Sequence, residues 1–299
     1  MHVFVTGATG FIGSAVVREL LGAGHQVTGL ARSDQAAAAL AATGAAVHRG
    51  DLKDLDSLRG GAAAADGVIH TAYIHDFSPT GDPVAAAQTD GRAIEAMGEV
   101  LAGSGRPLVV ASGLVHAHGR PATEEDDAPD TPAHPRVSEH VALPLAQRGV
   151  RVSVVRLPPS VHGEGDYAFI PALIGIAGAK GLSAYVGDGA NRWAAVHRLD
   201  AALLFRLALT EAPAGTRWHA IGDEGVPFRD IAEVIGKQLN VPVMSLRPEE
   251  AADNFGTFAG FAAADMTASC TLTRKELGWE PTHPGLIADL DEGHYFTRG

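Results

Sequence analysis

The chain has 299 residues, of which 46% are hydrophobic, so it can bury the core of one large domain or of a domain with a smaller lobe. A formal net charge of −12 argues against nucleic acid and anionic membranes as partners, because both require clustered cations. A single cysteine, Cys270, excludes an intramolecular disulfide and a multi-cysteine zinc site. The N-terminus lacks the pattern of a signal peptide, and no window reaches about 18 uninterrupted apolar residues. We therefore expect a cytoplasmic protein.

The first half of the chain alternates short apolar segments with longer segments rich in alanine and leucine. The expected strands are 2–6, 26–31, 45–48, 67–71, 107–112 and 151–156, and the expected helices include 12–21, 35–42, 84–101 and 137–148. Strands that are apolar nearly throughout and separated by helices indicate a parallel sheet covered on both faces. This pattern predicts a doubly wound α/β domain, whose ligand binds beyond the carboxyl ends of the strands.

A glycine-rich segment, TGATGFIG at residues 6–13, follows the first expected strand and opens a helix. Glycines at these positions permit a tight turn, close approach of the backbone to a pyrophosphate, and close packing of the helix. The helix N-terminus would then face the phosphates. The alternative is a glycine turn without a ligand. We predict a dinucleotide site formed by Gly7, Thr9, Gly10, Phe11, Ile12 and Gly13.

The end of the second strand indicates which dinucleotide binds. A carboxylate there would hydrogen-bond the ribose 2′-OH, but the chain has Arg32 and Ser33, which favour the 2′-phosphate of NADP. Arg32 could instead be a solvated loop cation, and Asp34 leaves NAD as the less favoured choice. After the third strand, Asp51 and Leu52 offer a carboxylate and an apolar wall for adenine, although Asp51 could equally cap the next helix.

Several motifs together resemble the extended short-chain dehydrogenase/reductase family, which includes NAD(P)-dependent epimerases and dehydratases. They are TGATGFIG, Asp51-Leu52, DGVIHTA at 66–72, VVASG at 109–113, RLPPSVHG at 156–163, VHRLDAA at 196–202 and KELGWEP at 275–281. The resemblance implies a Rossmann domain in residues 1–160, extended by about 190–222, and a smaller substrate-binding lobe mainly in 161–299. It also implies that Ala72, Pro158 and Ser160 lie near the cofactor, and that the protein could form a homodimer.

The family normally uses a serine and a Tyr-x-x-x-Lys pair, and Ser112 matches the serine. The tyrosines of this chain are Tyr73, Tyr167, Tyr185 and Tyr295, so none lies between residues 113 and 166. Counting back from Glu139 and Arg156, which match the family's usual anchors, places the lysine position at His134 or Pro135 and the tyrosine position at Asp130 or Thr131. The chain is thus similar to the atypical branch of the family, which lacks the usual pair.

Hydride transfer to a carbonyl still requires a proton source, and the segment HTAYIHDF after the fourth strand offers candidates. Tyr73 could be the acid or a wall beside the nicotinamide. His75, oriented by Asp76, could be an acid or a surface loop residue. Ser112 could hydrogen-bond the substrate oxygen or only the backbone. We predict Tyr73, His75 and Ser112 as catalytic residues, while His134 or Arg136 could replace the charge of the lysine.

The rest of the chain supplies candidates for substrate contact. Residues 163–178 read as a glycine-rich loop entering a helix, 190–209 as a loop that becomes helical near Asp200, and 228–239 as a core helix. His116 and His118 lack a clear third ligand, so we expect no metal. Arg192 could bind a diphosphate, and His70 is expected in the core. The predicted substrate-binding residues are Phe77, His116, Tyr167 and Trp193.

These observations favour an NADP-dependent oxidoreductase that reduces a small, mainly apolar carbonyl or imine substrate. A sugar-nucleotide epimerase or dehydratase is a second enzymatic hypothesis, and the missing tyrosine counts against it. A third hypothesis is an NADP(H)-binding redox sensor without turnover.

Overall fold

The computed structural model describes residues 1–75, 81–117, 119–129 and 136–296. Its larger domain is built on a parallel sheet of seven strands in the order β10-β6-β5-β4-β1-β2-β3. These strands are β1 (His2–Thr6), β2 (Gln26–Ala31), β3 (Ala46–Arg49), β4 (Gly67–His70), β5 (Pro107–Gly113), β6 (Arg151–Leu157) and β10 (Thr216–His219). The strand order reverses between β1 and β4, so the predicted doubly wound α/β fold is confirmed.

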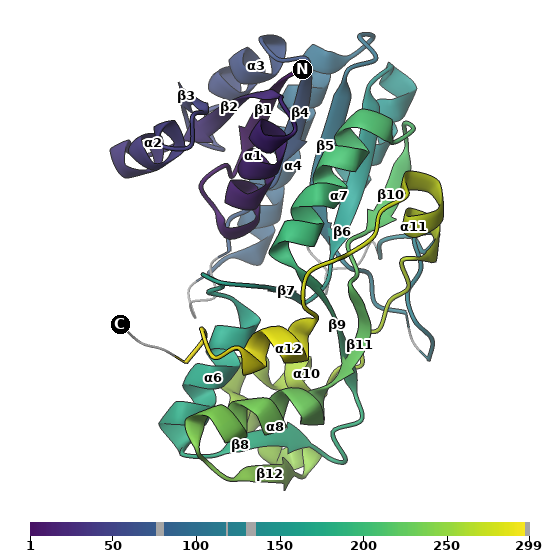
Figure 1. Cartoon of the computed structure of the whole chain (residues 1–299). Helices are drawn as coiled ribbons and strands as arrows, with labels where there is room; N and C mark the ends of the chain where they lie inside the picture. Colours follow the sequence, from purple (N-terminus) through teal and green to yellow (C-terminus); the bar gives the residue numbers. More distant parts are fainter. Residues whose placement is uncertain (76–80, 118, 130–135, 297–299) are drawn as a thin grey trace.

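Helices cover both faces of this sheet (Figure 1). The first face carries α1 (Phe11–Gly22), α2 (Asp34–Ala41) and α7 (Arg198–Glu211), and the second carries α3 (Leu55–Ala63), α4 (Pro83–Leu101) and α5 (Ser138–Ala142). Strand β1 shows why both faces are apolar, because Val3 and Val5 enter the first core and Phe4 enters the second. Both layers of helices are therefore held by the alternation of side chains along the same strands.

A smaller lobe lies below the sheet in the view of Figure 1. Its strands are β7 (Ser160–His162), β9 (Arg192–His197) and β11 (Asp223–Pro227) in one sheet, and β8 (Ser183–Val186) and β12 (Val243–Leu246) in another. Its helices are α6 (Phe169–Lys180), α8 (Phe228–Leu239), α9 (Ala251–Phe255), α10 (Ala259–Ala263) and α12 (Leu286–Asp291), whereas α11 (Thr271–Leu277) packs near α7 and β10. No helix in the described ranges is long and apolar enough to cross a membrane.

Two segments differ from the sequence-based expectation. Residues 192–197 form strand β9 and not a loop, because β9 pairs with both β7 and β11 and its apolar side chains are buried. The helix expected over 137–148 is divided into α5 and a 3₁₀ segment, Leu143–Arg148. Pro144 explains the division, since proline lacks the N–H that an α-helix needs. The helix predicted at 228–239 coincides with α8.

Candidate dinucleotide-binding and catalytic site

The loop between β1 and α1 forms a cradle in which Gly7, and Gly13 in the helix that follows, have no space for a side chain. Gly7 has a φ of +69°, and a Cβ there would lie 2.7 Å from the Ala72 nitrogen. A Cβ on Gly13 would lie 2.0 Å from the Gly7 carbonyl oxygen. Phe11, Ile12 and Gly13 form the first turn of α1, whose N–H groups have no partner within a helix. This geometry fits a dinucleotide diphosphate at the helix N-terminus, with Ala72 beside it.

Basic residues gather where β2 and β3 end. Arg32 is exposed directly after β2, and the Ser33 hydroxyl caps α2 by accepting a hydrogen bond from the Ala36 N–H at 3.1 Å. Arg49, the last residue of β3, forms an ion pair with Asp34 and donates to the Ser33 carbonyl at 2.6 Å. Arg49 is not among the predicted site residues. A cation at the end of the parallel strand next to β2 is the sequence feature that could have identified it. Asp34 therefore balances the charge of Arg49, and Arg32 is left as an exposed cation at the end of β2.

The segment after β3 removes one of the two alternatives for Asp51, that of a helix cap. Asp51 does not cap α3, because Asp54 is the cap and accepts from the Ser57 N–H at 3.0 Å. Asp51 instead accepts from the Lys53 N–H at 2.9 Å within a turn, and Leu52 packs against the core beneath α3. The turn holds Asp51 at the carboxyl end of β3.

An aromatic and cationic cluster follows β4. The Arg136 guanidinium lies 4.2 Å from the centroid of the Tyr73 ring, and the His75 ring lies 4.9 Å from Tyr73. Burial raises the pKa of the Tyr73 phenol, and the Arg136 charge lowers it in part. Partial burial, together with the same cation, lowers the pKa of His75 and favours a neutral imidazole. The cluster therefore places a cation directly on a phenol beside the dinucleotide loop.

A buried hydrogen-bond network supports Arg136. Its Nε donates to the Ser138 hydroxyl at 3.2 Å, and Ser138 donates to Asp90 at 2.5 Å. The other oxygen of Asp90 bonds His70 Nε2 at 3.0 Å, and His70 Nδ1 bonds the Thr6 hydroxyl at 2.7 Å. His70 is thus a core histidine, as expected, but its partners are side chains. The network links the end of β1 to α5 and fixes the direction from which Arg136 approaches.

Serine side chains near the expected nicotinamide end differ in accessibility. Ser112 is 6% exposed in β5, and its hydroxyl has no hydrogen bond to any residue that the structure describes. Ser160 is 2% exposed, and its hydroxyl is buried without a partner in β7. Pro158 is also buried. Any contact of Ser160 with a ligand would therefore have to come from its backbone, whereas the Ser112 hydroxyl is not committed to the backbone.

The predicted substrate-binding residues do not all lie together. Tyr167 is 70% exposed and meets the Phe11 ring edge-on, with centroids 6.1 Å apart. Trp193 is fully buried in β9 and donates to the Phe261 carbonyl at 3.1 Å, so its side chain lies in the core of the smaller lobe. His116 is exposed near Asp265, the same carboxylate that pairs with Arg192 at 3.2 Å. Phe77, Asp76, His118 and the expected tyrosine and lysine positions at 130–135 lie outside the described residues.

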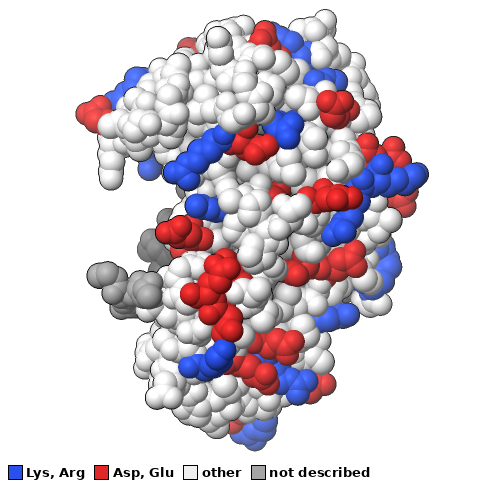
Figure 2. Space-filling model, in the orientation of Figure 1, with Lys and Arg blue, Asp and Glu red and all other residues white. Residues whose placement is uncertain are grey.

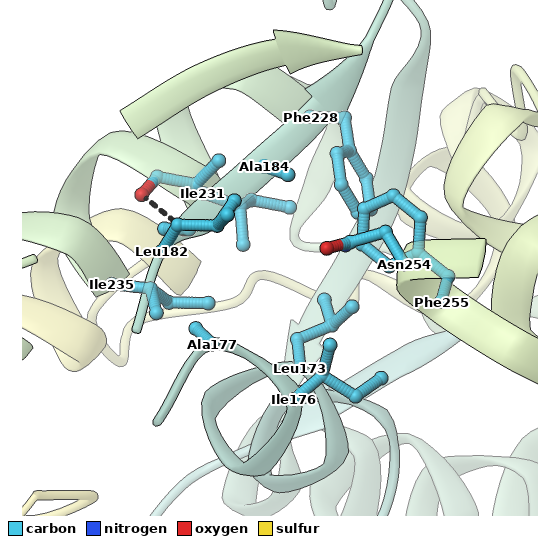
Figure 3. Close-up of a pocket in the computed structure, with 12 residues that line it drawn as sticks. Leu173, Ile176, Ala177, Leu182, Ala184, Phe228, Ile231, Ile235, Asn254 and Phe255 are labelled. Carbon is cyan, nitrogen blue, oxygen red and sulfur yellow. Dashed lines mark hydrogen bonds between the residues drawn. The ribbon is translucent and has the colours of Figure 1, made fainter. Parts of the chain in front are cut away.

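A small apolar cavity lies inside the smaller lobe, between α6, β8, α8 and α9 (Figure 3). Its side chains, including Leu173, Phe228 and Phe255, point toward one another and leave about 10 Å³, enough for about one water. This cavity is part of the core. Figure 2 shows a hollow where the upper domain meets the lower lobe at the left of the view, with acidic and basic side chains interspersed over the visible face.

Residues 3–220 match the model of the NAD dependent epimerase/dehydratase family. The chain belongs to this family. An uncharacterized protein of Schizosaccharomyces pombe is 49% identical over 99% of this chain and 100% of its own length. The 4-hydroxy-2-methyl-3-oxo-4-farnesyl-3,4-dihydroquinoline-1-oxide ketoreductase of Stigmatella aurantiaca is 28% identical over 79% of this chain and 72% of its own.

Solved structures in the same superfamily share the fold. The crystal structure of DesIV, a dTDP-glucose 4,6-dehydratase from Streptomyces venezuelae with NAD and TYD bound, superposes with a TM-score of 0.77. It has 21% sequence identity, and the match covers 98% of this chain and 96% of that one. The family match over residues 3–220 confirms the predicted resemblance to the extended short-chain dehydrogenase/reductase family, while the absence of the Tyr-x-x-x-Lys pair stays a prediction. The superfamily contains NAD-dependent epimerases, dehydratases and reductases, and NAD is the cofactor that the family description names.

Proposed function

We propose that this protein is an NADP-dependent reductase that transfers hydride to the carbonyl or imine carbon of a small, mainly apolar substrate. The observation that carries the proposal is the Arg136 guanidinium, 4.2 Å from the Tyr73 ring at the end of β4. The cation offsets part of the rise in the Tyr73 pKa that burial causes, because it stabilises the phenolate that forms when the phenol donates its proton. Ala72, one residue earlier in the chain, adjoins the dinucleotide loop.

A reduced nicotinamide dinucleotide supplies the hydride when it is bound. In the proposed reaction, the carbonyl carbon receives that hydride and Tyr73 donates its phenolic proton to the oxygen, which yields an alcohol. Arg136 stabilises the resulting phenolate, and the Ser112 hydroxyl donates a hydrogen bond to the substrate oxygen. His75 is exposed and lies against Tyr73, so it can accept a proton from water and return one to the phenolate.

The preference for NADP rests on the charges at the ends of β2 and β3. Arg32 is exposed there, and Arg49 pairs with Asp34, the carboxylate nearest to the position that would select NAD. Because Arg49 neutralises Asp34, that carboxylate would not repel a ribose 2′-phosphate, and the exposed Arg32 guanidinium is left to bind it.

Support for an apolar substrate comes from exposed hydrophobic side chains near the loop. Ile74, next to Tyr73, is 36% exposed, and Tyr167 is 70% exposed against Phe11. Exposed apolar side chains around a polar reaction centre are typical of small-molecule sites. The ketoreductase among the relatives acts on a carbonyl according to its name, which agrees with this substrate class.

The test is NADPH consumption by the purified protein with a panel of ketones, aldehydes, imines and nucleotide sugars, with NADH in parallel. Tyr73→Phe should lower turnover by about 100-fold or more, as expected for loss of a general acid. Tyr185→Phe is the matched control, because Tyr185 also lies under a guanidinium, that of Arg229 at 5.9 Å, but in the smaller lobe. A fluorescence titration should give the same NADPH affinity for wild type and both variants.

Equal turnover of the Tyr73 and Tyr185 variants would overturn the proposed acid. Tight NADPH binding without turnover of any compound would favour the redox sensor. Conversion of a nucleotide sugar without net NADPH consumption would favour an epimerase or dehydratase.

A further inference from the structure

Helices α1 and α7 run side by side in the same direction. Phe11 at the start of α1 contacts Arg198 at the start of α7, and two turns later Glu19 accepts a hydrogen bond from Arg206 at 2.6 Å. Both pairs have the same sequence offset, 187, which fixes a parallel register between the helices. The N-termini of α1 and α7 therefore lie together at the dinucleotide loop.

Arg198 occupies the space between this loop and the smaller lobe. Its guanidinium lies 5.0 Å from the centroid of the Phe11 ring, and a Cβ on Gly165 would lie 3.8 Å from its Nη1. Within the part of the chain that the structure describes, the Arg198 guanidinium forms no ion pair with a carboxylate. Arg206, two turns further along α7, is by contrast neutralised by Glu19. Arg198 is thus a positioned cation with its charge uncompensated.

We infer that Arg198 binds the diphosphate of the dinucleotide from the side of the smaller lobe, opposite the backbone N–H groups of α1. The inference rests on the proposed function, because it assumes that a dinucleotide occupies the loop. A guanidinium can donate two parallel hydrogen bonds to a phosphate. Because Arg198 already stacks on Phe11, its side chain loses less conformational entropy when it binds the phosphate. The cofactor would then be held by the dinucleotide loop and by the β9–α7 junction, where the smaller lobe meets the sheet domain.

The test compares Arg198→Gln with Arg206→Gln. Both changes remove one positive charge from α7 at its contact with α1, but Arg206 lies two turns from the loop. Arg198→Gln should weaken binding of NADPH and NADH equally, by about 10- to 100-fold, because both share the diphosphate. Arg206→Gln should leave both affinities within about twofold of wild type. Inorganic pyrophosphate should compete with NADPH for wild type and lose this ability in Arg198→Gln, while adenosine 2′-monophosphate should bind equally to all three proteins.

Equal affinities of the Arg198 and Arg206 variants for both dinucleotides would overturn this inference and leave the proposed function standing. A loss confined to NADPH would also overturn it, since Arg198 would then contact the 2′-phosphate. A wild-type protein that binds neither dinucleotide would overturn the proposed function and the inference together. Matching melting temperatures of the two variants would show that any difference arises at the site.

Discussion

Glu139 and Arg156 form a buried ion pair that holds α5 against β6. Arg156 is fully buried and Glu139 is 3% exposed, and the guanidinium donates to the two carboxylate oxygens at 2.9 and 2.7 Å. Arg217 in β10 donates to the same carboxylate, and Arg156 also donates to the carbonyl of Asp126 at 2.6 Å. The pair lies next to Ser138 and thereby supports the segment that carries Arg136.

Glu139→Gln removes the negative charge and keeps the shape, so it leaves the Arg156 charge buried without a counter-ion. Loss of one partner of a buried pair costs about 3–5 kcal/mol of folding free energy. At about 2–4 °C per kcal/mol, the melting temperature should fall by roughly 6–20 °C. The matched control is Glu99→Gln, because Glu99 pairs with Arg59 at 3.1 Å on the surface, with side chains 43% and 38% exposed. That pair should contribute less than about 1 kcal/mol.

The measurement is urea unfolding followed by circular dichroism for wild type, both glutamine variants, Arg156→Met and the double variant Glu139→Gln/Arg156→Met. The double variant should be more stable than Glu139→Gln alone, because methionine removes the uncompensated charge. If Glu139→Gln lost no more stability than Glu99→Gln, the assignment of a buried, energetically coupled pair would be wrong.

Two further changes test charge at other positions. Arg32→Asp should weaken NADPH binding by about 100-fold and leave NADH binding unchanged or stronger, because it removes a phosphate ligand and adds a repelling carboxylate; unchanged NADPH preference in a titration would refute the 2′-phosphate role of Arg32. Burial raises the pKa of Asp166 to about 6. The folded protein therefore binds this proton more tightly than the unfolded chain, and the resulting stability is fully present below about pH 4 and lost as the pH rises through about 6. Asp166→Asn removes this contribution. Between pH 4 and pH 7 the unfolding free energy of wild type should therefore fall relative to that of the variant. Parallel curves of unfolding free energy against pH for the two proteins would contradict the assignment.

Sequence alone was sufficient for the features that depend on local backbone chemistry. The strands β1 and β2 and helix α8 lie at the predicted residues, because apolar runs and helical periodicity are properties of short segments. The cradle of Gly7 and Gly13 was also predictable, since its close approach excludes any Cβ. The family resemblance follows from the same motifs.

Tertiary structure decided which side chains meet. Arg136 and Tyr73 are distant in sequence, and only the packing of α5 beside β5 and α4 brings the guanidinium over the phenol. Trp193 is buried because β9 pairs with two partner strands, which local sequence does not specify. Arg49 neutralises Asp34 only because β2 and β3 pair in parallel and end together. Such pairings depend on the register and packing of whole elements, which is why they are absent from any short stretch of the chain.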